Sequence, residues 1–149
     1  MEIKRIGVEE LALVVPLFDQ YRQFYQQEAD VELAEKFIQD RLRHNESVIF
    51  VALENGDAIG FTQLYPAYSS VRVTKNWILN DLYVVNERRK SGVGHALIAA
   101  AMKFAENDEA TFVQLETAAD NYTAQRLYEA IGFKKQEPET GFFVYRIDV

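Results

Sequence analysis

The most constraining feature of the chain lies in residues 81–106, where a strand pattern is followed by a short basic turn and a helix pattern. Residues 88–90, Arg-Arg-Lys, form the only run of three cations in a chain whose formal net charge is −7. Gly92 and Gly94 follow, where a helix would begin and its first N–H groups would still lack partners. Backbone donors, a helix dipole and nearby cations together favour an anion. The sequence therefore predicts an anion-binding turn between a strand and a helix.

The composition indicates a well-packed globular protein. The 149 residues are 48% hydrophobic and 13% aromatic, so we expect a single domain spanning residues 1–149. The chain has no cysteine, which excludes disulfides, thiolate metal sites and a cysteine nucleophile. Residues 1–6 lack the apolar stretch of a signal peptide, and no apolar run approaches the ~20 residues of a membrane span. The expectation is a soluble cytoplasmic protein that does not enter a membrane.

The charge balance bears on partners. A pI near 4.9 predicts repulsion from the phosphates of nucleic acids, and no basic stripe offsets it. The same charge favours the approach of cationic small molecules. The two histidines, His44 and His95, are far apart in the sequence, so no metal site is expected.

Apolar periodicity and turn signals predict a mixed α/β (α+β) sheet of element order β-α-α-β-β-β-α-β-α-β-β. Strands are expected at residues 3–6, 47–53, 58–65, 77–85, 111–117, 133–136 and 142–147. Helices are expected at residues 9–27, from the N-cap Asp30 to His44, from the glycine turn to about residue 106, and at 121–131. The sheet should be antiparallel early, with βα crossovers in the second half.

Two local patterns refine this outline. Asn55-Gly56 suits the positive φ angles of a tight hairpin turn between the second and third strands. In the fourth strand, simple alternation places Leu79, Asp81 and Tyr83 on one face.

The glycine turn fits neither of two common phosphate-binding motifs. Gly92 and Gly94 do not sit in the Walker pattern Gly-x-x-x-x-Gly-Lys-Ser/Thr, and Leu97 occupies the third glycine position of a dinucleotide fingerprint. What is left is Arg-x-x-Gly-x-Gly at residues 89–94. This hexapeptide resembles the acyl-CoA-binding motif of the GNAT (Gcn5-related N-acetyltransferase) superfamily, Gln/Arg-x-x-Gly-x-Gly/Ala.

A second segment agrees with this resemblance. Residues 121–133, Asn-Tyr-Thr-Ala-Gln-Arg-Leu-Tyr-Glu-Ala-Ile-Gly-Phe, are similar to the Asn-x-x-Ala-x-x-Leu-Tyr-x-x-x-Gly-Phe segment of the family. The order of elements also matches, so the resemblance covers essentially the whole chain and implies the GNAT acyl-CoA N-acyltransferase fold.

The resemblance implies a site for acetyl-CoA. In the family, the fourth and fifth strands splay apart around the pantetheine arm, and the glycine turn holds the diphosphate. The implied cofactor-binding residues of this chain are Leu82, Tyr83, Val84, Arg89, Lys90, Ser91, Gly92, Val93, Gly94, His95 and Asn121. Asn121 also suits a helix N-cap, and the two glycines also suit an ordinary turn.

Transfer of an acetyl group from a thioester needs a neutral amine, a polarised carbonyl and a proton donor for sulfur. The resemblance assigns the last role to Tyr128 as general acid, although its helix position also suits a packed aromatic residue. Direct attack by the amine needs no covalent intermediate, which agrees with the missing cysteine.

The general base is less defined. Asp81 and Glu116 are the candidates, one on each strand expected to flank the cofactor. Residues 79–84 resemble the Leu-Glu-Asp-Leu-Tyr-Val stretch of diamine-acetyltransferase-like GNAT proteins, in which the glutamate is the favoured base. That position is Asn80 here, which cannot accept a proton. Three routes for removing the proton are therefore considered: Asp81 acting through a water molecule, a base elsewhere in the chain, or bulk solvent.

The acceptor is expected to be an amine. The aromatic residues Tyr25, Tyr65 and Tyr68, with Glu28 and Asp30 nearby in the sequence, suit a cationic amine through cation–π and carboxylate contacts. The same residues also suit plain coverage of the core.

These observations predict an acetyl-CoA-dependent N-acetyltransferase acting on a primary amine of a small cationic metabolite, such as a polyamine or amino-acid derivative. The alternatives are a protein N-terminal or lysine acetyltransferase and a non-catalytic acyl-CoA-binding sensor module. By analogy with the family, residues 133–147 would be a natural place for a homodimer contact.

Overall fold

The computed structural model covers residues 1–149. Contacts divide the chain into two compact parts, Met1–Glu116 and Thr117–Val149. The mixed α+β architecture confirms the predicted fold class. None of its helices has both the length and the apolar character that crossing a membrane requires.

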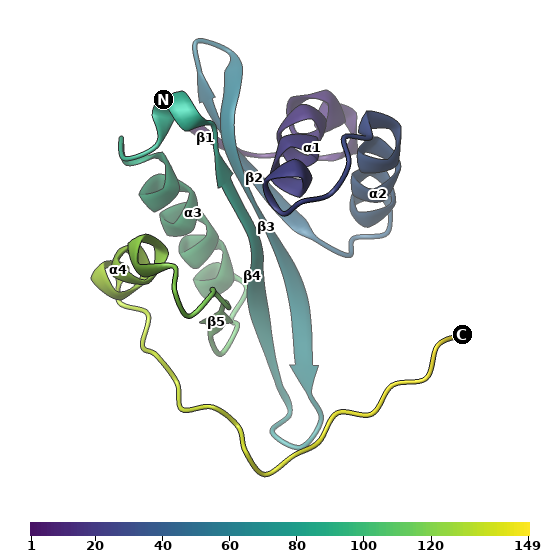
Figure 1. The fold of residues 1–149 in the computed structure, drawn as a ribbon, viewed down its shortest axis with the longest axis vertical. Coiled ribbons are helices and arrows are strands. Elements are labelled where there is room, and N and C mark those ends of the chain that lie inside the picture. The colour runs from purple at the N-terminus through teal and green to yellow at the C-terminus, as the bar shows by residue number, and fades with distance from the viewer. The chain divides into compact units, whose positions relative to one another are not determined.

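The first part is built on a five-stranded sheet. Its strands, in order across the sheet, are β1 (Glu2–Arg5), β2 (Val48–Glu54), β3 (Asp57–Ser69), β4 (Thr74–Val84) and β5 (Val113–Gln114). The first four are antiparallel, and β5 pairs with β4 in parallel. Helices α1 (Val15–Phe24) and α2 (Val31–Arg43) cover one face, and α3 (Val93–Asn107) covers the other (Figure 1).

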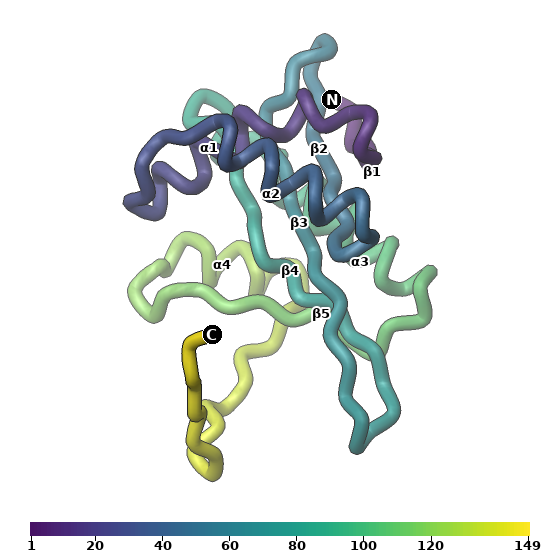
Figure 2. Tube along the Cα trace, turned by 90° about the vertical axis from the view of Figure 1, so that its right-hand side faces the viewer, coloured from purple at the N-terminus to yellow at the C-terminus, as the bar shows by residue number.

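The β2–β3 turn is the predicted tight hairpin, because Asn55 and Gly56 both have positive φ, at 52° and 85°. The next hairpin is longer than predicted. The pairing of β3 with β4 continues to Ser69 and Thr74, and the two strands run together to the turn at residues 70–73 (Figure 2).

The prediction of one helix over residues 9–27 is wrong. A 3₁₀ helix, η1 (Val8–Leu13), comes first, and α1 starts only at Val15 with Pro16 in its first turn. Proline lacks an N–H, so it cannot donate a backbone hydrogen bond in the interior of a helix. The chain therefore stops one helix and starts another at this point, where Pro16 fits without loss of a hydrogen bond.

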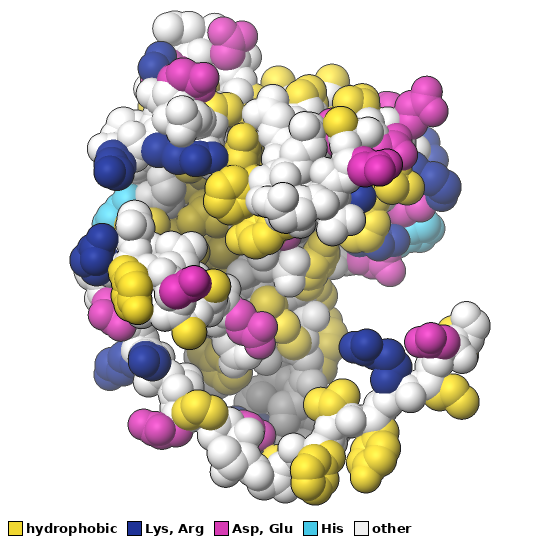
Figure 3. Space-filling view, in the orientation of Figure 1, with side chains coloured by type: hydrophobic (Ala, Val, Ile, Leu, Met, Phe, Trp, Pro, Cys, Tyr) yellow, Lys and Arg dark blue, Asp and Glu magenta, His cyan; other side chains and the backbone are white.

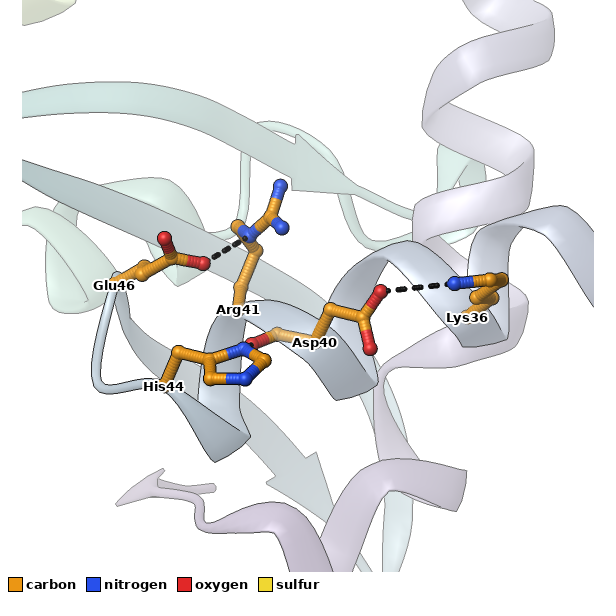
Figure 4. A network of polar contacts seen from close by, with 5 residues as sticks. All are labelled: Lys36, Asp40, Arg41, His44 and Glu46. Atoms are coloured by element: carbon orange, nitrogen blue, oxygen red, sulfur yellow. Dashed lines mark hydrogen bonds and ion pairs between the residues drawn. The ribbon is translucent and has the colours of Figure 1, made fainter.

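Helix α2 begins as predicted, because the Asp30 side chain accepts a hydrogen bond from the Leu33 N–H at 3.1 Å. A surface network occupies its far end (Figure 4); its members are Lys36, Asp40, Arg41, His44 and Glu46. There His44 Nδ1 lies 2.8 Å from the Asp40 carbonyl oxygen, which suits a histidine at a helix C-terminus.

A bulge in β4 controls which residues face which helices. Gln63 pairs with Asp81 but Leu64 pairs with Leu79, so Asn80 is an extra residue in the ladder. Trp77 contacts Phe104 of α3, at 5.0 Å between ring centroids. After the bulge, Asp81 and Tyr83 face α1 instead. The alternation that placed Leu79 with Asp81 and Tyr83 is therefore wrong, because one inserted residue reverses the faces.

Gly60 on β3 allows α3 to lie close to the sheet. A Cβ atom at this position would lie 2.9 Å from the Tyr83 carbonyl oxygen and 3.3 Å from side-chain atoms of Val93 and Leu97. Gly60 is therefore required because the position has no room for a side chain, and not because of its backbone conformation.

The second part contains α4 (Tyr122–Ile131), which ends at Gly132 with φ of 122°. The predicted strands at residues 133–136 and 142–147 are wrong, because neither segment is a strand. Residues 142–145 and Ile147 are 79–92% exposed, and apolar side chains line the C-terminal stretch in Figure 3. A strand requires a hydrogen-bonded neighbour, and alternation alone does not supply one. The predicted strand at 111–117 shortens to the two-residue β5.

Candidate active site

A pocket of about 300 Å³ opens in the first part, beside α1 and the β3–β4 pair. Its aromatic lining consists of Phe18, Tyr21, Tyr25, Phe37 and Tyr65, and its polar lining of Arg22, Gln27, Asn80 and Asp81. We call it the aromatic pocket. Its volume is at the small end of the range for ligand sites.

The aromatic rings hold one another in place. Phe18 of α1 stacks on Phe37 of α2, with centroids 5.7 Å apart and planes within 10°. Tyr21 meets Tyr25 edge to face at 5.1 Å. Residues 18, 21, 22 and 25 share one helix face because they are three or four positions apart. One helix face thus supplies much of the pocket wall.

Asp81 is the buried carboxylate of this pocket, with a relative exposure of 3%. Gln63 Nε2 donates to Asp81 Oδ2 at 2.5 Å, and Asn80 Nδ2 donates to Oδ1 at 3.0 Å. Burial raises the pKa of Asp81, and hydrogen bonds from Gln63, Asn80 and Tyr21 lower it in part. The group is thus tuned toward accepting a proton.

The hydrogen-bond partners of Asp81 are neutral, and no Lys or Arg forms an ion pair with it. A buried carboxylate without a cation is costly, and such a site gains most from a positively charged ligand. Asp81 therefore gives the pocket an electrostatic preference for a cation.

The hydroxyls of Tyr21 and Tyr65 lie in the same environment. Burial, and then the charge of Asp81, raises the pKa of each hydroxyl above its usual range near 10. Both side chains therefore stay neutral at physiological pH and act as hydrogen-bond donors rather than bases. Tyr21 also donates a long hydrogen bond, 3.4 Å, to the Asn80 carbonyl oxygen.

The structure brings Tyr25, Tyr65 and Asp81 to one pocket, and it leaves other predicted residues outside it. Tyr68 is 73% exposed, with Lys75 Nζ 6.0 Å from its ring centroid. Asp30 caps α2, and Glu28 does not line the pocket. Glu116 is exposed at the end of the first part and also does not line it.

Sequence reasoning missed Gln63 and Arg22. Gln63 is fully buried, and its Oε1 has no hydrogen-bond partner. A polar amide inside an apolar strand was the available signal, because buried polar groups need partners. For Arg22 the sequence offers no comparable signal, because its aromatic neighbours in the first helix suggest core packing.

The anion turn, residues 88–95, has the predicted strand–turn–helix form. Gly92 is the N-cap of α3 with φ of 89°, and Lys90 also has positive φ, at 64°. Such alternating backbone conformations direct successive N–H groups to one side. The Ser91 hydroxyl donates to the Arg88 carbonyl, and Arg88 pairs with Glu54 of β2. The turn is thereby tied to the sheet.

Arg89 turns back onto the sheet rather than outward. Its Nε donates to the Val84 carbonyl oxygen at 2.9 Å, and its guanidinium lies 5.5 Å from the ring centroids of both Phe24 and Tyr83. Arg89 thus links the anion turn to the end of α1. His95 is exposed in the first turn of α3, beside Gly94.

The predicted pantetheine strand has an open edge toward β5. Pairing between β4 and β5 covers only Trp77 with Val113 and Ile78 with Gln114. Leu82, Tyr83 and Val84 lie beyond this point, so no β5 residue pairs with them. Their backbone groups on that side can receive an extended ligand as an added strand.

Two predicted residues lie in the second part. Asn121 caps α4, because its Oδ1 accepts a hydrogen bond from the Ala124 N–H at 3.2 Å. Tyr128 is half-buried, with its ring centroid 6.0 Å from that of Phe133. The Tyr128 carbonyl accepts hydrogen bonds from the N–H groups of Gly132 and Phe133.

Comparisons with known proteins identify the family. The family model described as "Acetyltransferase (GNAT) family" matches residues 14–133. An "Uncharacterized N-acetyltransferase YhfO" from Bacillus subtilis (strain 168) is 44% identical over 149 residues, covering 100% of this chain and 98% of that protein.

Solved structures agree on the fold. The "Crystal structure of a probable acetyltransferase" superposes with a TM-score of 0.90 at 38% identity, covering 99% of both chains. An aminoglycoside N-acetyltransferase solved in complex with CoA gives a TM-score of 0.82 at 21% identity, covering 98% of this chain and 95% of that chain. The chain therefore belongs to the GNAT acetyltransferase family and is an acyltransferase enzyme.

Proposed function

We propose that this enzyme transfers the acetyl group of acetyl-CoA to the primary amine of a small cationic metabolite, a polyamine or an amino-acid derivative. The observation that carries the proposal is the buried carboxylate of Asp81 in the aromatic pocket, which neutral donors hold and no cation balances. An ammonium group entering this pocket would meet a carboxylate and aromatic faces together.

The residues of the anion turn fit the diphosphate of acetyl-CoA. The start of α3 offers N–H groups that lack helical partners, Gly92 leaves them uncovered, and Lys90 supplies an exposed positive charge. Val93, Gly94 and His95 would donate from the first turn of α3. Leu82, Tyr83 and Val84 would bind the pantetheine arm along the open edge of β4, with Asn121 donating from its amide nitrogen.

Acetyl-CoA supplies the activated acyl group as a thioester. The acceptor enters as an ammonium ion and gives up one proton to Asp81, directly or through a water molecule. The amine nitrogen then forms a bond to the acyl carbon while the carbon–sulfur bond breaks. Tyr128 gives its proton to the departing sulfur, and the second amine proton replaces it on the Tyr128 hydroxyl. The products are an amide, a thiol and one released proton.

Asp81 suits the base role because its raised pKa brings its proton affinity closer to that of an amine. Asn80 keeps the carboxylate oriented by donating to Oδ1. This arrangement gives Asn80 a role although it cannot accept a proton. Glu116, two residues after the end of β5, is the alternative base in the proposal.

The proposal includes a homodimer through residues 142–147. The exposed apolar side chains of this segment favour burial against another surface. Light scattering tests this point, and replacing Phe143 and Tyr145 by serine should then lower the mass from that of a dimer to that of a monomer.

Thermal denaturation with acetyl-CoA is the first test. Ligand at a hundred times its dissociation constant adds about 2.7 kcal/mol to the free energy of unfolding, which for a protein of this size means a rise in Tm of several degrees. Release of free thiol is then followed with a panel of amines. A protein that binds acetyl-CoA but releases no thiol with any amine or peptide would be a sensor module.

Two further results separate the rivals. Thiol release only with peptides would identify a protein acetyltransferase. Turnover with small amines that falls in Asp81→Asn, but not in the exposed control Asp148→Asn, would support the proposed site.

A further inference from the structure

Arg22 is the second charged residue of the aromatic pocket. It lies on α1, one residue after Tyr21, and lines the pocket together with Asp81. Its side chain is half-buried and makes one hydrogen bond, a long contact of 3.4 Å from Nη1 to the Glu28 carbonyl oxygen. No carboxylate forms an ion pair with it.

Arg41, an arginine on the neighbouring helix, differs from Arg22 in its ion pairing. Arg41 of α2 lies over the Phe37 ring, 4.5 Å from its centroid, but Glu46 already pairs with it at 3.0 Å. Arg22 therefore differs from Arg41 in having no negative partner, although it contacts the pocket directly. The pocket thus holds one unbalanced negative charge, on Asp81, and one unbalanced positive charge, on Arg22.

We propose that Arg22 binds a carboxylate of the acceptor, so that the acceptor class is a small zwitterion of amino-acid type. This inference rests on the proposed function and selects within it. The guanidinium group binds carboxylates with two parallel hydrogen bonds, and it is never deprotonated at physiological pH. The ammonium end of the acceptor lies toward Asp81 and its carboxylate toward Arg22.

The same charges disfavour a polyamine. A chain with a second ammonium group would place positive charge near the Arg22 guanidinium, while an amino acid carries one ammonium group for Asp81 and one carboxylate for Arg22. The pocket volume of about 300 Å³ suits a single small molecule of this kind. Arg22 is therefore a specificity-determining residue, and it takes no part in proton transfer.

The test compares acceptors that differ only at the carboxylate. A panel of L- and D-amino acids is assayed by thiol release beside the amide of each, the amine lacking the carboxyl group, and spermidine. Wild-type kcat/KM should be about 10- to 100-fold higher for the preferred amino acid than for its amide, the range expected for a charged hydrogen bond.

Arg22→Gln should remove this preference. We expect its kcat/KM to fall about 10- to 100-fold for the amino acid, mainly through KM, and to change less than about twofold for the amide. Arg43→Gln, an exposed arginine at the end of α2, is the matched control and should match wild type. Calorimetry should also find weaker binding of the N-acetylated amino acid to Arg22→Gln.

Two results would overturn the inference. In the first, wild type acetylates amides, simple amines or spermidine as well as amino acids, and Arg22→Gln lowers all rates equally. Arg22 then binds no carboxylate of the acceptor, and the proposed function still stands. If no amine is acetylated by a protein that binds acetyl-CoA, the proposed function fails and this inference fails with it.

Discussion

Gln63 on β3 donates a hydrogen bond to Asp81 on β4 at 2.5 Å, directly beside the point where Asn80 bulges out of the ladder. The two side chains face the same side of the sheet because their residues are ladder partners. The bulge turns Asp81 toward α1 and the aromatic pocket, and Gln63 fixes its orientation there. A carboxylate is thus buried and held without any charged protein group.

Replacing Asp81 by asparagine should lower turnover and move the pH–rate profile to higher pH. The variant cannot accept a proton, so the acceptor amine must lose its proton to bulk solvent. The expected loss in kcat is about 10²–10⁴-fold near neutral pH, the usual span for an acid–base group. Steady-state thiol release across pH 6–10 measures it. An unmoved profile would remove Asp81 from the proton path.

The same variant should fold, and its stability should depend on pH in a defined direction. Because burial raises the pKa of Asp81, the folded protein binds this proton more tightly than the unfolded chain. Wild type therefore loses stability as pH rises from the ordinary aspartate value to the raised value. Asparagine has no such proton, and its amide nitrogen can donate to the unpartnered Gln63 Oε1 after a flip of the Gln63 amide.

The Tm of Asp81→Asn minus that of wild type should therefore increase as the pH rises above about 4, the ordinary range of an aspartate, and level off once the pH passes the raised pKa of Asp81. Asp148→Asn, at an exposed position, should show no such trend. A difference in Tm that does not change with pH would mean that Asp81 carries no raised pKa.

Local signals predicted local structure well. Asn55-Gly56 forms the expected turn, Asp30 caps α2, and Gly92 stands at the start of α3. Each of these depends on backbone preferences and hydrogen bonds within a few residues, which the sequence displays directly. Apolar periodicity predicted the order of the elements as far as α4, and it failed for the two strands expected after α4.

Which residues line the aromatic pocket depends on how β3 pairs with β4. The sequence does not show this pairing. The sequence links Glu28 and Asp30 to the aromatic residues only because they are close to Tyr25 along the chain. The structure instead places Asp81 beside Tyr21 and Gln63, through strand register and the bulge at Asn80. Alternation in one strand cannot reveal a bulge, because the inserted residue is defined by its partner strand.

Gly92→Val should weaken acetyl-CoA binding. Gly92 has φ of 89°, which a β-branched residue adopts only with strain, and its side chain would cover the N–H groups at the start of α3. Gly56→Val is a matched control, because Gly56 has φ of 85° and is equally open. Calorimetric titration should find at least about tenfold weaker binding, or about 1.4 kcal/mol, only in Gly92→Val. Equal affinities would separate the glycine turn from the cofactor.

Gly60→Ala should destabilise the first part of the chain. Its Cβ would lie 2.9 Å from the Tyr83 carbonyl oxygen, which as backbone can move only with β4. Overpacking of this kind costs about 1–3 kcal/mol. Denaturant unfolding measures this loss, and Gly141→Ala, where the new atom meets nothing within 4 Å, should be neutral. Unchanged stability would mean that β4 and α3 can move away from the new Cβ atom at little cost in free energy.

Tyr128→Phe tests the general acid. Removing the hydroxyl should lower kcat by about 10²–10⁴-fold if it protonates the departing sulfur, while acetyl-CoA affinity changes little. Tyr122→Phe is the control on the same helix, because Tyr122 is 63% exposed and has no proposed role. The loss should be smaller with an acyl donor whose thiol leaves readily as the anion, because such a thiolate needs no proton. A loss of equal size for both donors, or a fall in Tm that accounts for the lost activity, would make Tyr128 a packing residue of α4.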